Sequence, residues 1–202
     1  MRKAAAAPES GVIDISGPKM REIVVRVVGD APLICNRMSE ESKLIILGDP
    51  EAKARAKSKI FAPPEQRWKT TLHVVNAEEL RFGYPGAAFH SALINAGRFS
   101  GIQMTHLSGW FRVHWGLLEI HGDAPVMDEA MGRPPGQQQM MPIYRARFND
   151  WQIDVPVKFD ESLLPLKSFL GLFARAGQQV GVGAFRPQNK GPFGTFKVEA
   201  LV

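Results

Sequence analysis

Two arginines, Arg145 and Arg147, are spaced so that their side chains act together. Residues 143–157 alternate apolar and polar positions, which is typical of half-buried β-structure. Side chains two residues apart in a strand share a face, so both guanidinium groups point away from Phe148. Arginine binds phosphate oxygens through paired hydrogen bonds. The pair therefore fits either an exposed sheet edge or a cleft that holds a nucleic-acid backbone.

A glycine-rich segment, residues 177–194, surrounds two further cations, Arg186 and Lys190. It is not a dinucleotide-binding fingerprint, because Arg186 stands at the third glycine position, and no Gly-Lys-Ser/Thr follows. Glycines let a backbone pass close to a ligand, and exposed amides with two cations suit phosphate oxygens. The alternative is a helix cap and a hairpin with incidental charge. Phe185 is a candidate for stacking on a base.

A basic run lies between residues 53 and 69, where Glu65 is the only acidic residue. Such a run either follows a phosphate backbone, with Trp68 stacking on a base, or forms an ordinary solvated surface. The candidate phosphate contacts in it are Lys53, Arg55, Lys57, Lys59, Arg67 and Lys69.

The histidines offer a different chemistry. His90 and His114 are candidate general bases for metal-independent RNA cleavage, and the alternative is that they are packing or surface residues. The five histidines show no metal-ligand spacing, and the single Cys35 excludes an intramolecular disulfide or a thiolate zinc site. We expect no metal, no cofactor and, in the leading interpretation, no catalytic residue.

The spacing of apolar residues predicts an α+β fold. We expect a central strand at residues 21–28, an amphipathic helix at 84–97, a half-buried strand at 110–120 and a last strand at 195–202. The alternation in 143–157 changes phase at residues 149–150, which requires a bulge or tight turn.

A second helix is expected to be capped by Asp160 or Ser162 and to run to about Ala176. Its expected buried residues are Leu163, Leu166, Leu170 and Phe173. The order of elements predicts an RRM-like or ferredoxin-like antiparallel sheet, with helices on one face. The other face is expected to be open and to carry aromatic and arginine side chains, as in many platforms for single-stranded nucleic acid.

Length and charge agree with this picture. A chain of 202 residues and 22.3 kDa suits a single domain at residues 21–202, after a flexible tail at 1–20. Large loop insertions are expected at residues 39–69, as a basic loop or short helix, and at 122–142, as a surface loop or hairpin. The net charge of +5 favours an anionic partner, and the absence of a long apolar run or signal peptide favours a cytoplasmic protein without membrane contact.

Two segments resemble the RAMP superfamily, the RRM-like proteins of CRISPR effector complexes. Residues 84–89 (YPGAAF), followed by a helix, are similar to that family's strand-to-helix junction, and residues 181–196 resemble its C-terminal glycine-rich loop. Small uncharacterised bacteriophage proteins have a similar ending, with an Arg-x-Arg-Phe-x-x-Trp strand like residues 145–151. The resemblance covers the second half of the chain and, in the first half, the strand and helix junction.

The resemblance implies a RAMP-like fold that binds single-stranded RNA or DNA through phosphates, with little sequence preference. Such a protein would form a homo-oligomer along the strand or join a ribonucleoprotein complex, in CRISPR antiviral defence or in phage replication, in the cytoplasm of a bacterium or phage-infected host. Two alternatives remain open. One is a RAMP-type metal-independent endoribonuclease, and the other is a phage protein that binds or inhibits another protein.

Overall fold

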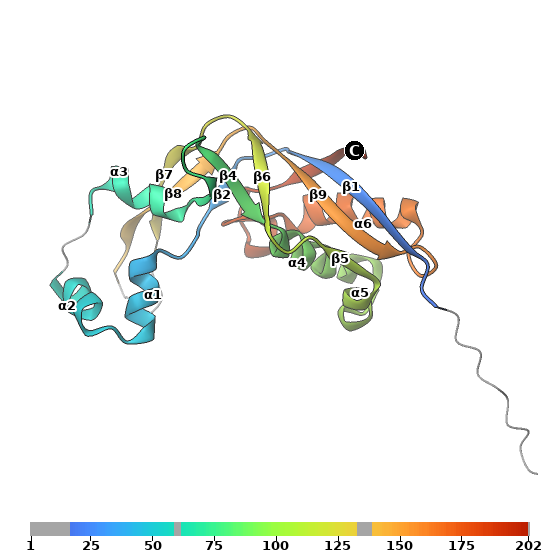
Figure 1. The fold of residues 1–202 in the computed structure, drawn as a ribbon, viewed down its shortest axis with the longest axis horizontal. Helices are drawn as coiled ribbons and strands as arrows, with labels where there is room; N and C mark the ends of the chain where they lie inside the picture. Colours follow the sequence, from blue (N-terminus) through green and yellow to red (C-terminus); the bar gives the residue numbers. More distant parts are fainter. Residues whose placement is uncertain (1–16, 59–61, 133–138, 202) are drawn as a thin grey trace, which may run out of the picture.

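Two antiparallel sheets organise the computed structural model, which describes residues 17–58, 62–132 and 139–201 (Figure 1). The main sheet contains β1 (Met20–Gly29), β3 (His73–Asn76), β4 (Arg81–Pro85), β5 (Phe111–Val113), β6 (Leu117–Gly122), β9 (Trp151–Asp160) and β10 (Phe196–Leu201). The small sheet contains β2 (Leu33–Cys35), β7 (Val126–Gly132) and β8 (Met141–Phe148). The helices are α1 (Glu40–Leu47), α2 (Pro50–Ser58), α3 (Pro64–Arg67), α4 (Gly86–Ala96), α5 (Met104–Trp110) and α6 (Leu166–Arg175).

The main sheet has the topology that the sequence predicts. Along the chain, these elements occur in the order β1, α4, β6, β9, α6 and β10, with other elements between some of them. Within the sheet, the four strands lie side by side in the order β10-β1-β9-β6. Strands β1 and β6 both pair antiparallel with β9, which lies between them. This is the split βαβ arrangement of ferredoxin-like and RRM-like proteins. The predicted α+β, RRM-like fold is therefore confirmed.

The core lies between the main sheet and the helices α4, α5 and α6, which cover one of its faces (Figure 1). Strand β1 is central, as predicted, and Val25 lies opposite Val155 of β9 with neither side chain exposed. Helix α4 also occupies the predicted residues. It buries Phe89, Ala92, Leu93 and Ala96, which recur at the spacing of one helix face.

The expected continuous strand at residues 110–120 is wrong. Trp110 ends α5, and the strand is divided into β5 and β6 by residues 114–116. The Gly86 amide at the start of α4 donates to the Gly116 carbonyl at 2.9 Å, so the backbone leaves the sheet there to receive the helix. Trp115, in this break, is consequently 68% exposed.

The expected start of the second helix is also wrong. The Asp160 carboxylate accepts hydrogen bonds from the amides of Lys19 and Ser162, which ties the turn after β9 to the beginning of β1. Helix α6 starts later, at Leu166, after Pro165. Its fully buried side chains are Phe169, Leu172 and Phe173; Leu166 and Leu170 only flank the core, and Leu163 is 53% exposed.

The phase change at residues 149–150 marks a passage between sheets. Strand β8 belongs to the small sheet and β9 to the main sheet, and residues 149–150 form the bend between them. Each strand therefore sets its own alternation. Trp151, the first residue of β9, anchors the bend through its indole Nε1, which donates to the Ala31 carbonyl at 2.8 Å.

The two expected insertions contain regular structure. Residues 39–69 include α1, α2 and α3, and Figure 1 shows α1 and α2 at the end of the molecule away from α5 and α6. Residues 122–142 include β7 and the start of β8; residues 133–138, like most of the expected tail at 1–20, lie outside the described residues. Within the described ranges, no helix is long and apolar enough to cross a lipid bilayer.

The open face of the main sheet differs from the expected aromatic platform. Arg26 pairs with Asp154 at 2.7 Å, Lys158 with Glu22 at 2.7 Å, and Arg81 with Glu119, each across neighbouring strands. The rings of Phe111, Trp151, Phe159 and Phe196 are instead buried in the core. Arg145 and Arg147 lie on β8 in the small sheet. The aromatic part of this expectation is therefore wrong for these strands; of the arginines, Arg26 and Arg81 are paired, whereas Arg112 of β5 is exposed on this face.

The corrected position of α6 makes a direct prediction. Phe169 is fully buried and stacks on Phe159 with ring centroids 4.5 Å apart, so Phe169→Ala should lower the free energy of unfolding by about 3–5 kcal/mol. Leu163→Ala, at an exposed position, should change it by less than about 0.5 kcal/mol. Urea unfolding followed by circular dichroism measures both. A similar loss in the two variants would contradict the observed start of α6.

Candidate nucleic-acid interface

The glycine-rich segment forms a loop, residues 181–194, that packs against β2 and the residue before it. The Ala184 amide donates to the Ile34 carbonyl, and the Gly194 amide to the Pro32 carbonyl, both at 2.9 Å. Gly194 closes the loop with φ of 68°, and a Cβ there would lie 1.7 Å from the Val182 carbonyl oxygen, so only glycine fits. These backbone amides hold the loop in place. Its side chains are therefore better placed than those amides to meet a ligand.

A polar cavity of about 440 Å³ lies where this loop meets the two sheets. We call it the Arg145 cavity. It is lined by Asn36, His73, Tyr84, Arg145, Gly183, Ala184, Phe185, Arg186 and Asn189. Two arginines and no carboxylate are among these residues, so the cavity is positively charged. The sequence-predicted residues Arg145, Phe185 and Arg186 are thus brought together from β8 and the loop.

Arg145 is the most unusual residue of the cavity. It is only 8% exposed, and its buried Nε and Nη1 atoms have no hydrogen-bond partner. Its guanidinium lies over the Phe185 ring, 4.6 Å from the ring centroid. Burial lowers the pKa of Arg145, although Asp128 opposes that shift. A buried charge without hydrogen bonds costs several kcal/mol, so an anion in the cavity would stabilise this side chain.

Arg147 shares the face of Arg145, as predicted, but is paired through Nη1, while its buried Nε has no hydrogen-bond partner. Its Nη1 lies 3.3 Å from Oδ1 of Asp128, a buried residue of β7 that is directly opposite Arg145 in the strand register. One carboxylate therefore serves two neighbouring arginines. Strand β8 lies between β2 and β7, so the alternative of an exposed sheet edge is wrong.

Arg186 makes its hydrogen bonds to neutral groups. Its Nη1 donates to the Gly183 carbonyl at 3.0 Å, and its Nε and Nη2 donate to Oε1 of Gln188 at 3.1 Å. The preceding Phe185 has a φ of 54°, a conformation that a bulky residue adopts at a cost in energy. Such local strain is often found at functional sites. Phe185 remains 37% exposed, so part of its ring faces solvent.

Other lining residues were not identified from the sequence. Burial raises the pKa of the Tyr84 phenol and lowers the pKa of the His73 imidazole, which favours its neutral form. The two rings meet edge to face, with centroids 6.2 Å apart. Asn36 follows β2 and Asn189 belongs to the glycine-rich loop. Only tertiary structure brings these residues together, so no local motif signals them.

The remaining cations predicted from the sequence lie elsewhere. Lys190 is exposed and closes a turn of the loop, with φ of 62°, without lining the cavity. Lys53, Arg55 and Lys57 belong to α2, and Lys59 lies outside the described residues. Arg55 forms ion pairs with Glu41 at 3.5 Å and Glu51 at 3.7 Å, so acidic residues that precede the basic run neutralise part of it.

The segment around Trp68 packs on the protein itself. Trp68 is partly buried against the hydrophobic core, and the Lys69 ammonium lies 5.8 Å from its ring centroid. Arg67 lies over the Tyr144 ring at 5.1 Å. Tyr144 is on the strand face opposite Arg145, so this group is separate from the Arg145 cavity. A contact of these residues with nucleic acid stays a prediction.

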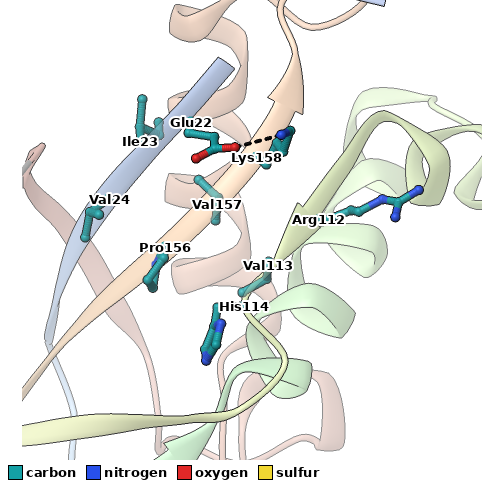
Figure 2. Close-up of a pocket in the computed structure, with 9 residues that line it drawn as sticks. All are labelled: Glu22, Ile23, Val24, Arg112, Val113, His114, Pro156, Val157 and Lys158. Atoms are coloured by element: carbon teal, nitrogen blue, oxygen red, sulfur yellow. Dashed lines mark hydrogen bonds and ion pairs between the residues drawn. The ribbon is translucent and has the colours of Figure 1, made fainter. Parts of the chain in front are cut away.

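The two candidate histidines lie on different sides of the main sheet. His90, on α4, packs between Phe111 and Trp115 at centroid distances of 5.2 and 5.7 Å, and burial lowers its pKa. His114 is exposed beside Pro156 on the open face, in a second cavity of about 470 Å³ (Figure 2). The described residues contain no group of three or more His, Cys, Asp or Glu placed to hold a metal ion.

Figure 2 shows the charges of this second cavity. The Lys158 ammonium faces the Glu22 carboxylate and pairs with it, while the Arg112 side chain extends away from that pair. The apolar side chains of Val24, Val157 and Pro156 also line this cavity and lie on the side of the pair away from Arg112. This cavity therefore has less uncompensated positive charge than the Arg145 cavity and is the weaker candidate for binding an anion.

Comparisons with known proteins show a likeness in fold to solved structures. No protein-family model matches the sequence, and no curated protein matches it. The crystal structure of Cmr6 from Pyrococcus furiosus is similar in fold, with a TM-score of 0.46 and 10% sequence identity, over 90% of this chain and 99% of that chain.

The unequal pairing of the two arginines predicts opposite effects on stability. Arg145→Met removes a buried charge without hydrogen bonds at Nε and Nη1, so the free energy of unfolding should stay constant or rise by about 1 kcal/mol. Arg147→Met removes the hydrogen-bond donor of buried Asp128 and should lower it by about 1–3 kcal/mol. Urea unfolding compares the variants. Equal losses would show that Arg145 is satisfied within the protein.

Proposed function

We propose that this protein binds single-stranded RNA or DNA, without catalysing a reaction, and that the Arg145 cavity holds phosphate groups of the strand. The observation that carries this proposal is the buried guanidinium of Arg145, whose Nε and Nη1 lack partners in a cavity without carboxylates. Phosphate oxygens are acceptors that match an arginine in charge and geometry. Arg186 supplies a second cation, and the exposed part of Phe185 supplies a surface on which a base can stack.

The route of the strand follows from the distribution of charge. The cations of the open face that pair with carboxylates, such as Lys158 and Arg26, are less available to phosphates. The strand in our proposal therefore runs over the small sheet and the glycine-rich loop, with Lys190 as an outer contact. Lys53 on the projecting α2 would extend this path. A route of this kind reads the backbone and gives little sequence preference.

Assembly and biological setting belong to the same proposal. The resemblance of the sequence to RAMP proteins supports several copies along one RNA, within a CRISPR ribonucleoprotein complex. The similarity to phage proteins supports a single-stranded DNA in phage replication. The ribonuclease alternative has less support, because His90 and His114 lie on different sides of the main sheet and do not form one site.

Binding assays test the proposal. The double variant Arg145→Met/Arg186→Gln should bind a fluorescein-labelled 20-residue oligo-dT or oligo-rU with hydroxyl ends at least about tenfold more weakly at low salt. The slope of log affinity against log salt concentration should fall by about 0.7 for each phosphate that the variant no longer neutralises. Fluorescence anisotropy measures both quantities.

A matched control removes two positive charges at the other end of the main sheet. Lys19 lies just before β1 and Lys167 in the first turn of α6, and both are exposed. Lys19→Gln/Lys167→Gln should bind nearly as the unchanged protein does. Equal weakening of the two double variants would show that net charge, and not the Arg145 cavity, determines binding.

A further inference from the structure

We propose that the Arg145 cavity binds the phosphorylated end of a strand, that is, a terminal phosphate monoester. This inference rests on the proposed function, since it takes the ligand to be a single-stranded nucleic acid. It adds a preference for one chemical group, which backbone binding alone does not give.

Charge is the first argument. The lining residues include two guanidinium groups, those of Arg145 and Arg186, and no carboxylate. Asp128, the acid opposite Arg145 in the strand register, interacts electrostatically with Arg145 but is hydrogen-bonded to Arg147 and does not line the cavity. A backbone phosphodiester carries a single negative charge, whereas a phosphate monoester carries about −1.5 to −2 at pH 7. Two cations in one cavity therefore match the charge of a monoester better than the charge of a single diester.

Access to Arg145 is the second argument. The residue is 8% exposed, and the Phe185 ring covers its guanidinium. An internal phosphate is flanked by a sugar on each side and approaches a surface side-on. A terminal phosphate projects from the strand and can enter a cavity. A buried, partly unpaired guanidinium is therefore reached more readily by the end of a strand than by its middle.

The size and polarity of the cavity are the third argument. A volume of about 440 Å³ exceeds the space that a phosphate group needs and falls in the range of cavities for small ligands. Asn36, His73, Tyr84 and Asn189 add polar groups to the lining. Such groups can bind the sugar and base edge of a terminal nucleotide while Phe185 offers an aromatic surface. The lining thus suits one whole nucleotide with its terminal phosphate.

The test compares oligonucleotides of one sequence that differ only at their ends. Four 12-residue strands carry hydroxyls at both ends, a 5′-phosphate, a 3′-phosphate, or a 5′-phosphate capped as its methyl diester, each labelled at an internal base. We expect one of the two monoesters to bind at least about tenfold more tightly than the hydroxyl strand. If the 5′-phosphate gives this increase in affinity, its methyl diester should show little of it. The monoester that binds more tightly identifies the end of the strand that the cavity holds.

Variants connect the gain to the cavity. Arg145→Met/Arg186→Gln should abolish the difference between phosphate and hydroxyl ends, whereas Lys19→Gln/Lys167→Gln should retain it. If the difference survives in the arginine variant, the end binds elsewhere and the proposal is wrong. Arg145→Met is expected to fold, and urea unfolding checks this. A loss of the preference for phosphate ends will therefore report on binding and not on unfolding.

The outcomes separate this inference from the proposed function. Equal, arginine-dependent affinity for all four strands would overturn end recognition and leave backbone binding intact. If none of the strands binds, while a nucleoside monophosphate binds in an arginine-dependent way, the proposed function and end recognition both fail and the cavity is a mononucleotide site. Binding of neither strands nor nucleoside monophosphate overturns both proposals.

Discussion

The antiparallel pairing of β1 with β9 is the contact on which the other elements depend. It runs from Met20 opposite Asp160 to Val28 opposite Gln152. This register points Val25, Ile153 and Val155 at the helices and leaves Arg26 and Asp154 on the open face. A slip of one residue would exchange the two sets. Strands β10 and β6 then attach on either side, and α4 and α6 cover the apolar face that this register creates.

The contrast between paired and unpaired charge explains why one cavity stands out. Charged side chains on the open face pair across neighbouring strands, as Glu22 does with Lys158, and Arg55 on α2 has acidic partners as well. Arg145 differs because β8 is the middle strand of a small sheet and the loop's Phe185 lies over it. Its nearest acid, Asp128 of β7, is hydrogen-bonded to Arg147 and leaves the Nε and Nη1 of Arg145 without partners.

The spacing of residues along the chain was sufficient to predict the elements that depend on local interactions. The β-branched run at β1, the apolar face of α4 and the shared face of Arg145 and Arg147 all follow from spacing. The start of α6 could not be predicted, because Asp160 ties the turn to Lys19, which is distant in sequence. The break at residues 114–116 depends on a hydrogen bond to Gly86, which lies about thirty residues earlier. Asn36, His73 and Tyr84 line the Arg145 cavity from three separate strand ends or junctions. Contacts of this kind leave no periodic signal in the sequence.

The position of β1 has a consequence for how the chain reaches this structure. Strand β1 pairs with β9 and β10, which both come from residues 151–201. It therefore cannot form its pairings until most of the chain has been synthesised. Closing so long a segment slows folding, and an unpaired apolar strand is prone to aggregate in the meantime. The run from Ile23 to Val28 has only Arg26 as a charged interruption. A charge within an apolar run lowers the tendency of that run to aggregate, and Arg26, which pairs with Asp154 in the folded protein, is such a charge.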